Sequence, residues 1–187
     1  MRVIVLCPLP PSRGGITEWA KILKTNYKNI PSLKLKFINT FPRFKSYSDF
    51  LYIKRISAGL IEAPKTLYQL LKGILFFKPH LIHLTTSAKF GLLRDIVVII
   101  FCKILSVRVI YHLHFGRVPS IYKNINFESI FLTISLNLSD KVIVLDKLSE
   151  SVLLKFFRFN KIHFIPNGIK IPAQIDDSYH TSNDIVF

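Results

Sequence analysis

Two histidines that lie two residues apart are the side chains of this sequence best suited to chemistry. His112 and His114 stand in the stretch YHLHFGR, residues 111–117. On an extended segment, residues two apart point to the same side, so both imidazoles face one way and Leu113 faces the other. A neutral imidazole donates a hydrogen bond from one ring nitrogen and accepts one at the other, which suits sugar or phosphate oxygens. The alternative interpretation is that one of the two, His112 more readily than His114, merely packs under the loop.

A metal centre built on these histidines needs a third ligand. Neither cysteine supplies one, because Cys7 and Cys102 both lie inside apolar runs. Such positions predict small buried thiols in a reducing compartment rather than a disulfide. We therefore expect no metal and no other cofactor. The remaining histidines show no zinc-like spacing; they are His80, His83, His163 and His180.

A glycine pair follows the first apolar run of the chain. After residues 3–7 the sequence reads PLPPSRGGITEW, in which Arg13, Gly14 and Gly15 precede a helical period. The free N–H groups of a glycine turn at a helix N-terminus can face an anion, and the guanidinium would add positive charge. The stretch matches neither G-x-G-x-x-G nor a P-loop. A plain tight turn is the alternative interpretation.

Two further polar groups stand where strands are expected to end. Thr85, Thr86 and Ser87 follow the apolar stretch HLIHL and place three hydroxyls at a junction between a strand and a helix. One hydroxyl there is expected to cap the helix, which leaves the others for a substrate hydroxyl. Arg117 follows the two histidines, and its guanidinium suits a phosphate or a carboxylate.

These residues need a scaffold that brings the ends of several strands together. Strands that alternate with helices predict an α/β, Rossmann-like parallel sheet with helices on both faces, and ligands of such sheets bind beyond the carboxyl ends of the strands. Asp146 or Ser149 is expected to cap the last helix. The apolar periodicity places strands at 3–7, 33–38, 80–84, 107–112, 141–145 and 162–165, and helices at 16–27, 63–77, 90–105, 127–138 and 148–157.

The composition fits one domain with a short extension. Half of the 187 residues are hydrophobic, which allows a sizeable core. We expect the Rossmann-like domain in residues 1–170, and in 171–187 a polar linker that leads into a new strand. The apolar run at 96–102 is far shorter than the roughly 20 residues that span a bilayer, and no secretory signal is visible. We expect a cytoplasmic protein, soluble or peripheral at the inner face of the plasma membrane.

The chain is strongly basic, with 26 lysines and arginines against 11 acids and a net charge of +15. Such an excess favours an anionic partner, although a solvated basic face fits it equally well. Residues 41–55 (FPRFKSYSDFLYIKR) interleave aromatic and basic side chains. This pattern is typical of a membrane interface, of single-stranded nucleic acid binding, or of a partly buried helix with solvated charges. No nucleic-acid motif accompanies the charge, so we expect no nucleic-acid partner.

Taken in order, the motifs resemble the N-terminal domain of family 4 glycosyltransferases, which are retaining enzymes of the GT-B fold. The resemblance covers nearly the whole chain, and bacterial polysaccharide-assembly enzymes are the nearest members. The stretches that carry it are PLPPSRGGITEW, KPHLIHLTTS, VRVIYHLHFG, SDKVIVLDKLSESVL and KIHFIPNGI.

The resemblance implies a role for several positions. Gly14 and Gly15 match the glycine loop that approaches the donor diphosphate or the acceptor. His114, and His112 less closely, match the strand-end histidine near the transferred sugar. Asn167 matches the turn at the hinge beside the substrate cleft. The N-terminal half of these enzymes mainly selects the acceptor, often a lipid-linked one, and most members need no metal.

The sequence departs from the family in lacking the residues that hold the donor. In the family a C-terminal domain with a Glu-x7-Glu motif binds the nucleotide-sugar, and no such motif stands in this sequence. The resemblance therefore implies the acceptor half of a glycosyltransferase, inactive without a donor-binding half, with a nucleotide-sugar and a glycan or lipid-linked acceptor as partners. The alternative is a non-catalytic module that binds an anionic membrane surface.

Overall fold

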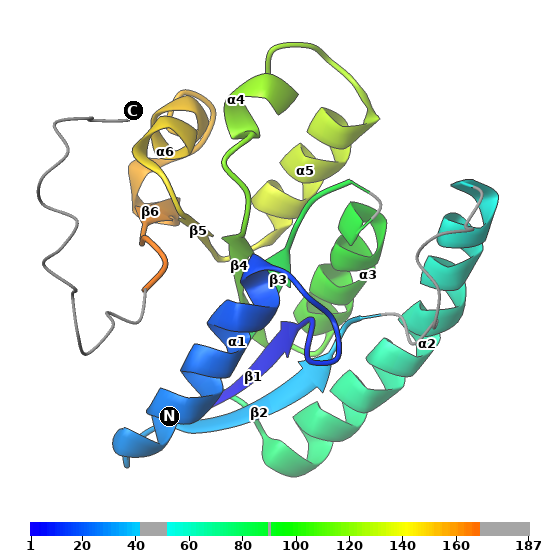
Figure 1. The fold of residues 1–187 in the computed structure, drawn as a ribbon, viewed down its shortest axis with the longest axis vertical. Helices are drawn as coiled ribbons and strands as arrows, with labels where there is room; N and C mark the ends of the chain where they lie inside the picture. The colour runs from blue at the N-terminus through cyan, green and yellow to red at the C-terminus, as the bar shows by residue number, and fades with distance from the viewer. Residues whose placement is uncertain (42–51, 90, 169–187) are drawn as a thin grey trace, which may run out of the picture.

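The computed structural model describes residues 1–41, 52–89 and 91–168, and of residues 52–63 only the backbone. Their core is one sheet in which all neighbouring strands are parallel, in the order β2-β1-β3-β4-β5-β6 (Figure 1). The strands are β1 (Arg2–Cys7), β2 (Lys34–Asn39), β3 (Leu81–Thr86), β4 (Arg108–Leu113), β5 (Lys141–Val144) and β6 (Ile162–Phe164).

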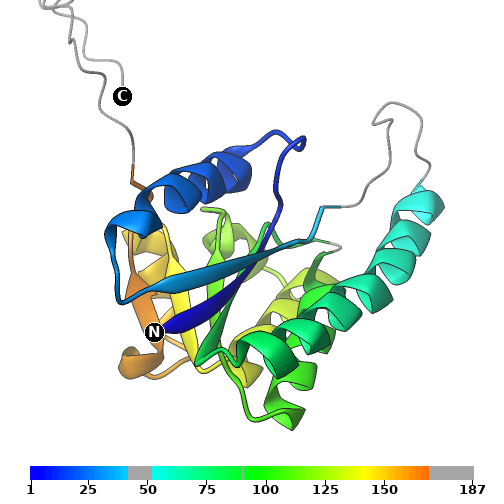
Figure 2. The same ribbon diagram turned by 90° about the horizontal axis from the view of Figure 1, so that it is seen from below.

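Helices connect these strands and cover the sheet on both faces. α1 lies on one face, and α2, α3 and α5 lie on the other (Figure 2). The helices are α1 (Gly15–Asn26), α2 (Tyr52–Phe77), α3 (Gly91–Ile104), α4 (Val118–Ile121), α5 (Phe127–Leu138) and α6 (Lys147–Leu153), with short 3-10 turns at Tyr27–Asn29 and Phe159–Lys161.

β1 is apolar from Val3 to Cys7 because both of its faces are buried. On β1, Val3 and Val5 pack with Ala20 of α1 in the smaller of two cores. The alternate residues Ile4 and Leu6 belong to the larger core, which α2, α3 and α5 share. The period of two along the strand thus assigns successive side chains to opposite layers.

A buried polar network crosses the larger core. The Asp95 carboxylate of α3 is fully buried. It accepts a hydrogen bond from the Tyr111 hydroxyl of β4 at 2.9 Å, and two more from the Arg94 guanidinium at 2.7 and 3.1 Å. Arg94 also donates to the carbonyl oxygen of Thr40, just past β2, at 3.2 Å. The network therefore joins α3 to two strands near the carboxyl edge of the sheet.

The predicted Rossmann-like fold is confirmed, including all six expected strands. Asp146 caps α6 as expected, since its carboxylate accepts a hydrogen bond from the Ser149 N–H at 2.7 Å. Two helices differ from the expectation. α2 begins at Tyr52, eleven residues before the predicted start, and α6 ends at Leu153, after which the chain continues in turns.

Two predictions fall on residues that the structure does not describe. The linker and strand expected at 171–187 lie outside the described residues, and so do positions 42–51 of the aromatic and basic segment. Among the described helices, none is both long enough and apolar enough to cross a membrane.

Candidate functional site

Three imidazoles and one indole ring meet on the α1 face of the sheet, toward the carboxyl ends of β3 and β4. His112 and His114 point to this face, as the alternation predicts, and their ring centroids lie 3.9 Å apart. Leu113 points to the opposite face and is buried in the larger core. His83 of β3 joins the pair, and its Nε2 lies 3.1 Å from Nδ1 of His112. Below, these three are called the histidine cluster.

Trp19 of α1 lies over the histidine cluster. Its ring centroid is 5.3 Å from that of His83, 5.4 Å from that of His112 and 4.9 Å from that of His114. The contacts with the last two are edge-on, a favourable arrangement for aromatic rings. α1 therefore places an indole ring over three closely packed imidazoles, of which His83 and His112 are joined by a hydrogen bond.

Burial keeps all three imidazoles neutral at neutral pH. It lowers the pKa of His83 to about 4 and that of His112 to about 2, and for both the charge of neighbouring histidines lowers it further. Burial also lowers the pKa of His114 to about 4. Neutral rings offer one donor and one acceptor each, which is what hydrogen bonding to hydroxyl groups requires.

Several ring nitrogens of the cluster have no hydrogen-bond partner in the described structure. They are Nε2 of His112 and both Nδ1 and Nε2 of His114, and all are buried. A buried polar group without a partner costs about 1–3 kcal/mol, and buried groups of this kind are uncommon in folded proteins. The cluster therefore presents free donors and acceptors that a polar ligand would satisfy.

The glycine loop begins the same helix that carries Trp19. Gly14 has a φ of 142°, which L side chains rarely adopt, and as the N-cap residue of α1 it has no side chain to cap the first N–H groups. Ser12 and Thr17 brace the loop through hydroxyls 2.7 Å apart. Arg13 is exposed, as are both glycines. Trp19 lies about one helical turn (~6 Å) beyond Gly15, so this N-terminus opens beside the histidine cluster.

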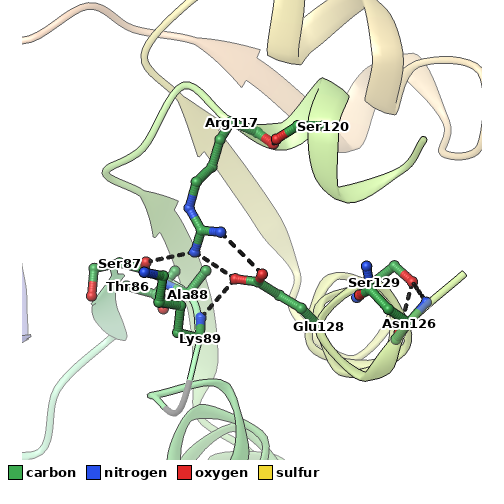
Figure 3. Close-up of polar contacts among 9 residues, drawn as sticks. All are labelled: Thr86, Ser87, Ala88, Lys89, Arg117, Ser120, Asn126, Glu128 and Ser129. Carbon is green, nitrogen blue, oxygen red and sulfur yellow. Dashed lines mark hydrogen bonds and ion pairs between the residues drawn. The ribbon is translucent and has the colours of Figure 1, made fainter. Parts of the chain in front are cut away.

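The loop after β3 is fixed by hydrogen bonds from two other elements (Figure 3). The buried Thr86 hydroxyl accepts from the N–H of Ala88 at 3.1 Å. Glu128 of α5 accepts from the N–H of Lys89 at 2.9 Å and binds the Arg117 guanidinium at 2.5 and 3.0 Å. Burial raises the pKa of Glu128, but these hydrogen bonds outweigh it and hold the pKa below its usual value.

Arg117 is therefore engaged by a carboxylate of this chain, and its expected role in binding a substrate anion stays a prediction. Its guanidinium also reaches the carbonyl oxygen of Ser87 at 3.5 Å. The Ser87 side chain is exposed. Asn167, which follows β6, is exposed as well, and within the described residues no hydrogen bond joins it to the histidine cluster. The structure thus gathers the histidines under α1 and leaves Asn167 apart.

No group of three or more histidine, cysteine, aspartate and glutamate side chains in the described residues is arranged to hold a metal ion. In the histidine cluster, one ring nitrogen of His83 and one of His112 are engaged in the hydrogen bond between these two residues. Both cysteines are free and buried, and burial raises the pKa of each thiol to about 12.

The fold of this chain resembles part of several solved structures. A structure of Staphylococcus aureus MnaA with UDP superposes on 86% of this chain and 42% of its own length, with a TM-score of 0.53 and 14% identity. Anabaena Alr3699/HepE with UDP-glucose covers 90% of this chain and 44% of its own, with a TM-score of 0.53 and 14% identity. The structure of the same protein with UDP and glucose covers 90% of this chain and 45% of its own, with a TM-score of 0.53 and 17% identity.

The chain has the fold of a GT-B Rossmann-like domain. It spans less than half the length of the solved proteins that it resembles. No protein-family model matches the sequence, and no curated protein matches it either. The likeness at these identities concerns the fold, so the functional argument depends on the residues of the site.

Sequence reasoning missed His83, Trp19 and Glu128 as members of this region. His83 lies opposite Ile110, two residues before His112, in the pairing of β3 with β4. That register is set by the packing of the whole sheet, and neither strand's sequence alone predicts it. A signal did exist for His83, because it is a polar residue at an alternating position in an otherwise apolar stretch.

Proposed function

We propose that this chain is the acceptor-side domain of a retaining glycosyltransferase. It would transfer a sugar from a nucleotide-sugar to a glycan or lipid-linked acceptor in cell-surface polysaccharide biosynthesis, on the cytoplasmic side. The observation that carries the proposal is the histidine cluster, whose free neutral nitrogens lie at the carboxyl edge of a GT-B Rossmann-like sheet. The solved structures of the same fold hold UDP or UDP-glucose, which supports a nucleotide-sugar as the donor.

In this proposal His114 and His112 bind hydroxyl groups of the reacting sugar. Their low pKa values favour the neutral rings, so they position oxygens by hydrogen bonds and do not deliver a proton at neutral pH. Gly14 and Gly15 offer the N–H groups of the α1 N-terminus to a phosphate. Thr86 and Ser87 border the same edge of the sheet, and Asn167 leads toward a second domain that binds the donor.

The test pairs this chain with the polypeptide expected to follow it. The chain alone should show no rise in melting temperature with UDP-glucose, since the proposed donor site lies in the second domain. The co-expressed pair should bind UDP and transfer label from a UDP-sugar to extracted lipid or glycan. His114→Ala should abolish transfer, whereas His163→Ala, at an exposed position of β6, should not.

Two results would contradict the proposal. One is a folded pair that neither binds UDP nor transfers label from any UDP-sugar supplied. The other is full transfer by the His112→Ala/His114→Ala double variant, which would remove the histidine cluster from the reaction. Circular dichroism of each variant separates these outcomes from misfolding.

A further inference from the structure

The outward faces of α3 and α5 carry large apolar side chains where a domain surrounded by water usually has polar ones. On α3 these residues recur at steps of four, three and four, which places them along one side of the helix. Their relative exposures lie between 37% and 80%. Together they are called the α3–α5 apolar face: Leu93, Val97, Ile100 and Ile104 of α3, and Phe127, Ile130 and Ile134 of α5.

The two helices present these residues on one continuous side of the molecule. Both pack their inner residues, such as Val98 and Leu136, into the same core on the same face of the sheet. They are also in contact with each other and lie side by side in both views (Figures 1 and 2). Their outward faces therefore point away from the sheet in the same direction. A contiguous apolar surface of this kind marks an interaction site.

The charges around the apolar face are positive. Lys89 and Lys103 stand near the two ends of α3, and Lys123 precedes α5; all three are exposed. Lys161 lies at the far end of α5, where its Nζ donates to the carbonyl oxygen of Asn137 at 2.9 Å. Burial and the nearby charge of Lys103 lower the pKa of Lys161, and the charge of Asp140 acts in the opposite direction without cancelling them. These four lysines, called the lysine rim, frame the face at both ends.

The two helices of the face contribute few acids. α3 and α5 are described in full from Gly91 and Phe127 onward, and they contain one acidic residue each. Asp95 is buried and held by Arg94 and Tyr111. Glu128 is bound to Arg117. Glu128 lies near Lys89 and Asp140 lies near Lys161, so the positive charge is partly offset at these two lysines. The face thus combines exposed apolar groups with a rim whose four lysines outnumber the two acids beside them.

We propose that the α3–α5 apolar face docks on an anionic lipid bilayer. Apolar side chains of a surface helix enter the boundary between headgroups and acyl chains, while flanking lysines meet anionic headgroups. A second copy of the chain fits less well, because a two-fold contact through this face would place lysine rims against each other. The inference does not depend on transferase activity, and it lies on the sheet face opposite α1 and the histidine cluster.

Vesicle co-sedimentation with the full chain tests the proposal. The chain should bind vesicles of phosphatidylcholine with phosphatidylglycerol and bind phosphatidylcholine alone far more weakly, and added salt should reduce the binding. Ile100→Gln/Ile130→Gln should lower the partition coefficient on the order of tenfold, since two inserted side chains are lost. Ile22→Gln on α1 is the matched control: Ile22 is 36% exposed against 42% for Ile100, but on the opposite face.

The lysine rim is tested separately. Lys103→Gln and Lys123→Gln should each weaken binding to the anionic vesicles about fivefold. Neither change should alter the weak binding to phosphatidylcholine, because that lipid has no net charge to attract them. Equal loss of binding to both kinds of vesicle would contradict the electrostatic part of the proposal.

Fluorescence reports the orientation of the docked chain. Trp19 is the sole tryptophan and belongs to α1, on the sheet face opposite α3 and α5, so vesicles should leave its emission unchanged. Ile104→Trp places a second indole at a position that is 74% exposed on the apolar face, and its emission should shift to the blue on binding. A shift of Trp19 alone, or vesicle binding that survives Ile100→Gln/Ile130→Gln, would overturn the proposal. So would a stable dimer by light scattering that this double variant dissociates and that fails to bind vesicles.

Discussion

Mild acid should unfold this domain through its histidine cluster. An unperturbed histidine has a pKa near 6.5, whereas the fold lowers the values to about 4 for His83, about 2 for His112 and about 4 for His114. Below pH 6.5 the unfolded chain therefore binds protons that the folded chain does not. The free energy of unfolding falls as the pH falls through this window, until the folded imidazoles themselves take up protons near pH 4.

The size of the effect follows from the number of protons. Near pH 5 each histidine contributes a slope of roughly 1.4 kcal/mol per pH unit, so the three together give about 4 kcal/mol per unit. Between pH 7 and pH 5 the loss is about 2 kcal/mol for each ring and about 6 kcal/mol in total. Because whole domains have unfolding free energies of about 5–15 kcal/mol, the loss amounts to a large part of the stability.

Urea denaturation followed by circular dichroism between pH 5 and pH 7 measures this slope. His114→Gln should reduce this slope by the contribution of about one proton, which is roughly 1.4 kcal/mol per pH unit. His163→Gln changes an exposed side chain and should leave the slope unaltered. A wild-type slope at or below that of a single proton would refute the reasoning. An unchanged slope in His114→Gln would show that the protons bind elsewhere.

Three further substitutions test packing away from the cluster, each by urea denaturation at pH 7. Ser106 follows α3 with a φ of 55°, so Ser106→Gly should stabilise the domain by about 0.5–1 kcal/mol, and a loss would contradict the backbone assignment. Tyr111→Phe removes a hydrogen bond to the buried Asp95 and should cost about 2 kcal/mol; a neutral result would mean that this carboxylate is satisfied without it. Glu128→Gln disrupts the partly buried pair with Arg117 and should cost about 1 kcal/mol, less at high salt.

The architecture was predictable from the sequence because the strands of this sheet are buried on both faces. Runs such as 3–7 and 107–112 stand out as apolar stretches between polar turns, and helical periods fill the gaps between them. The short helix α4 was not predicted, since four residues carry no periodicity. The early start of α2 was also missed, because residues 41–55 are rich in charged and aromatic side chains that favour no single structure.

The site was predictable only where it depends on one strand at a time. The common orientation of His112 and His114 follows from alternation within β4. The contact of His83 with His112 depends on the register between β3 and β4. The contact of Trp19 with the histidine cluster depends on how α1 crosses the sheet. Arg117 was expected to bind an anion of the substrate, which the structure does not test; its partner within the chain, Glu128, lies on a helix that only the tertiary structure brings near.

The carboxylate of Glu128 has a mechanical consequence. It holds Arg117 from the loop after β4 and the N–H of Lys89 from the loop after β3, and it belongs to α5 itself. Two loops at the carboxyl edge of the sheet are thus fastened to one of the helices that form the outer surface. A surface bound by α3 and α5 would therefore hold these two loops at a fixed distance from it.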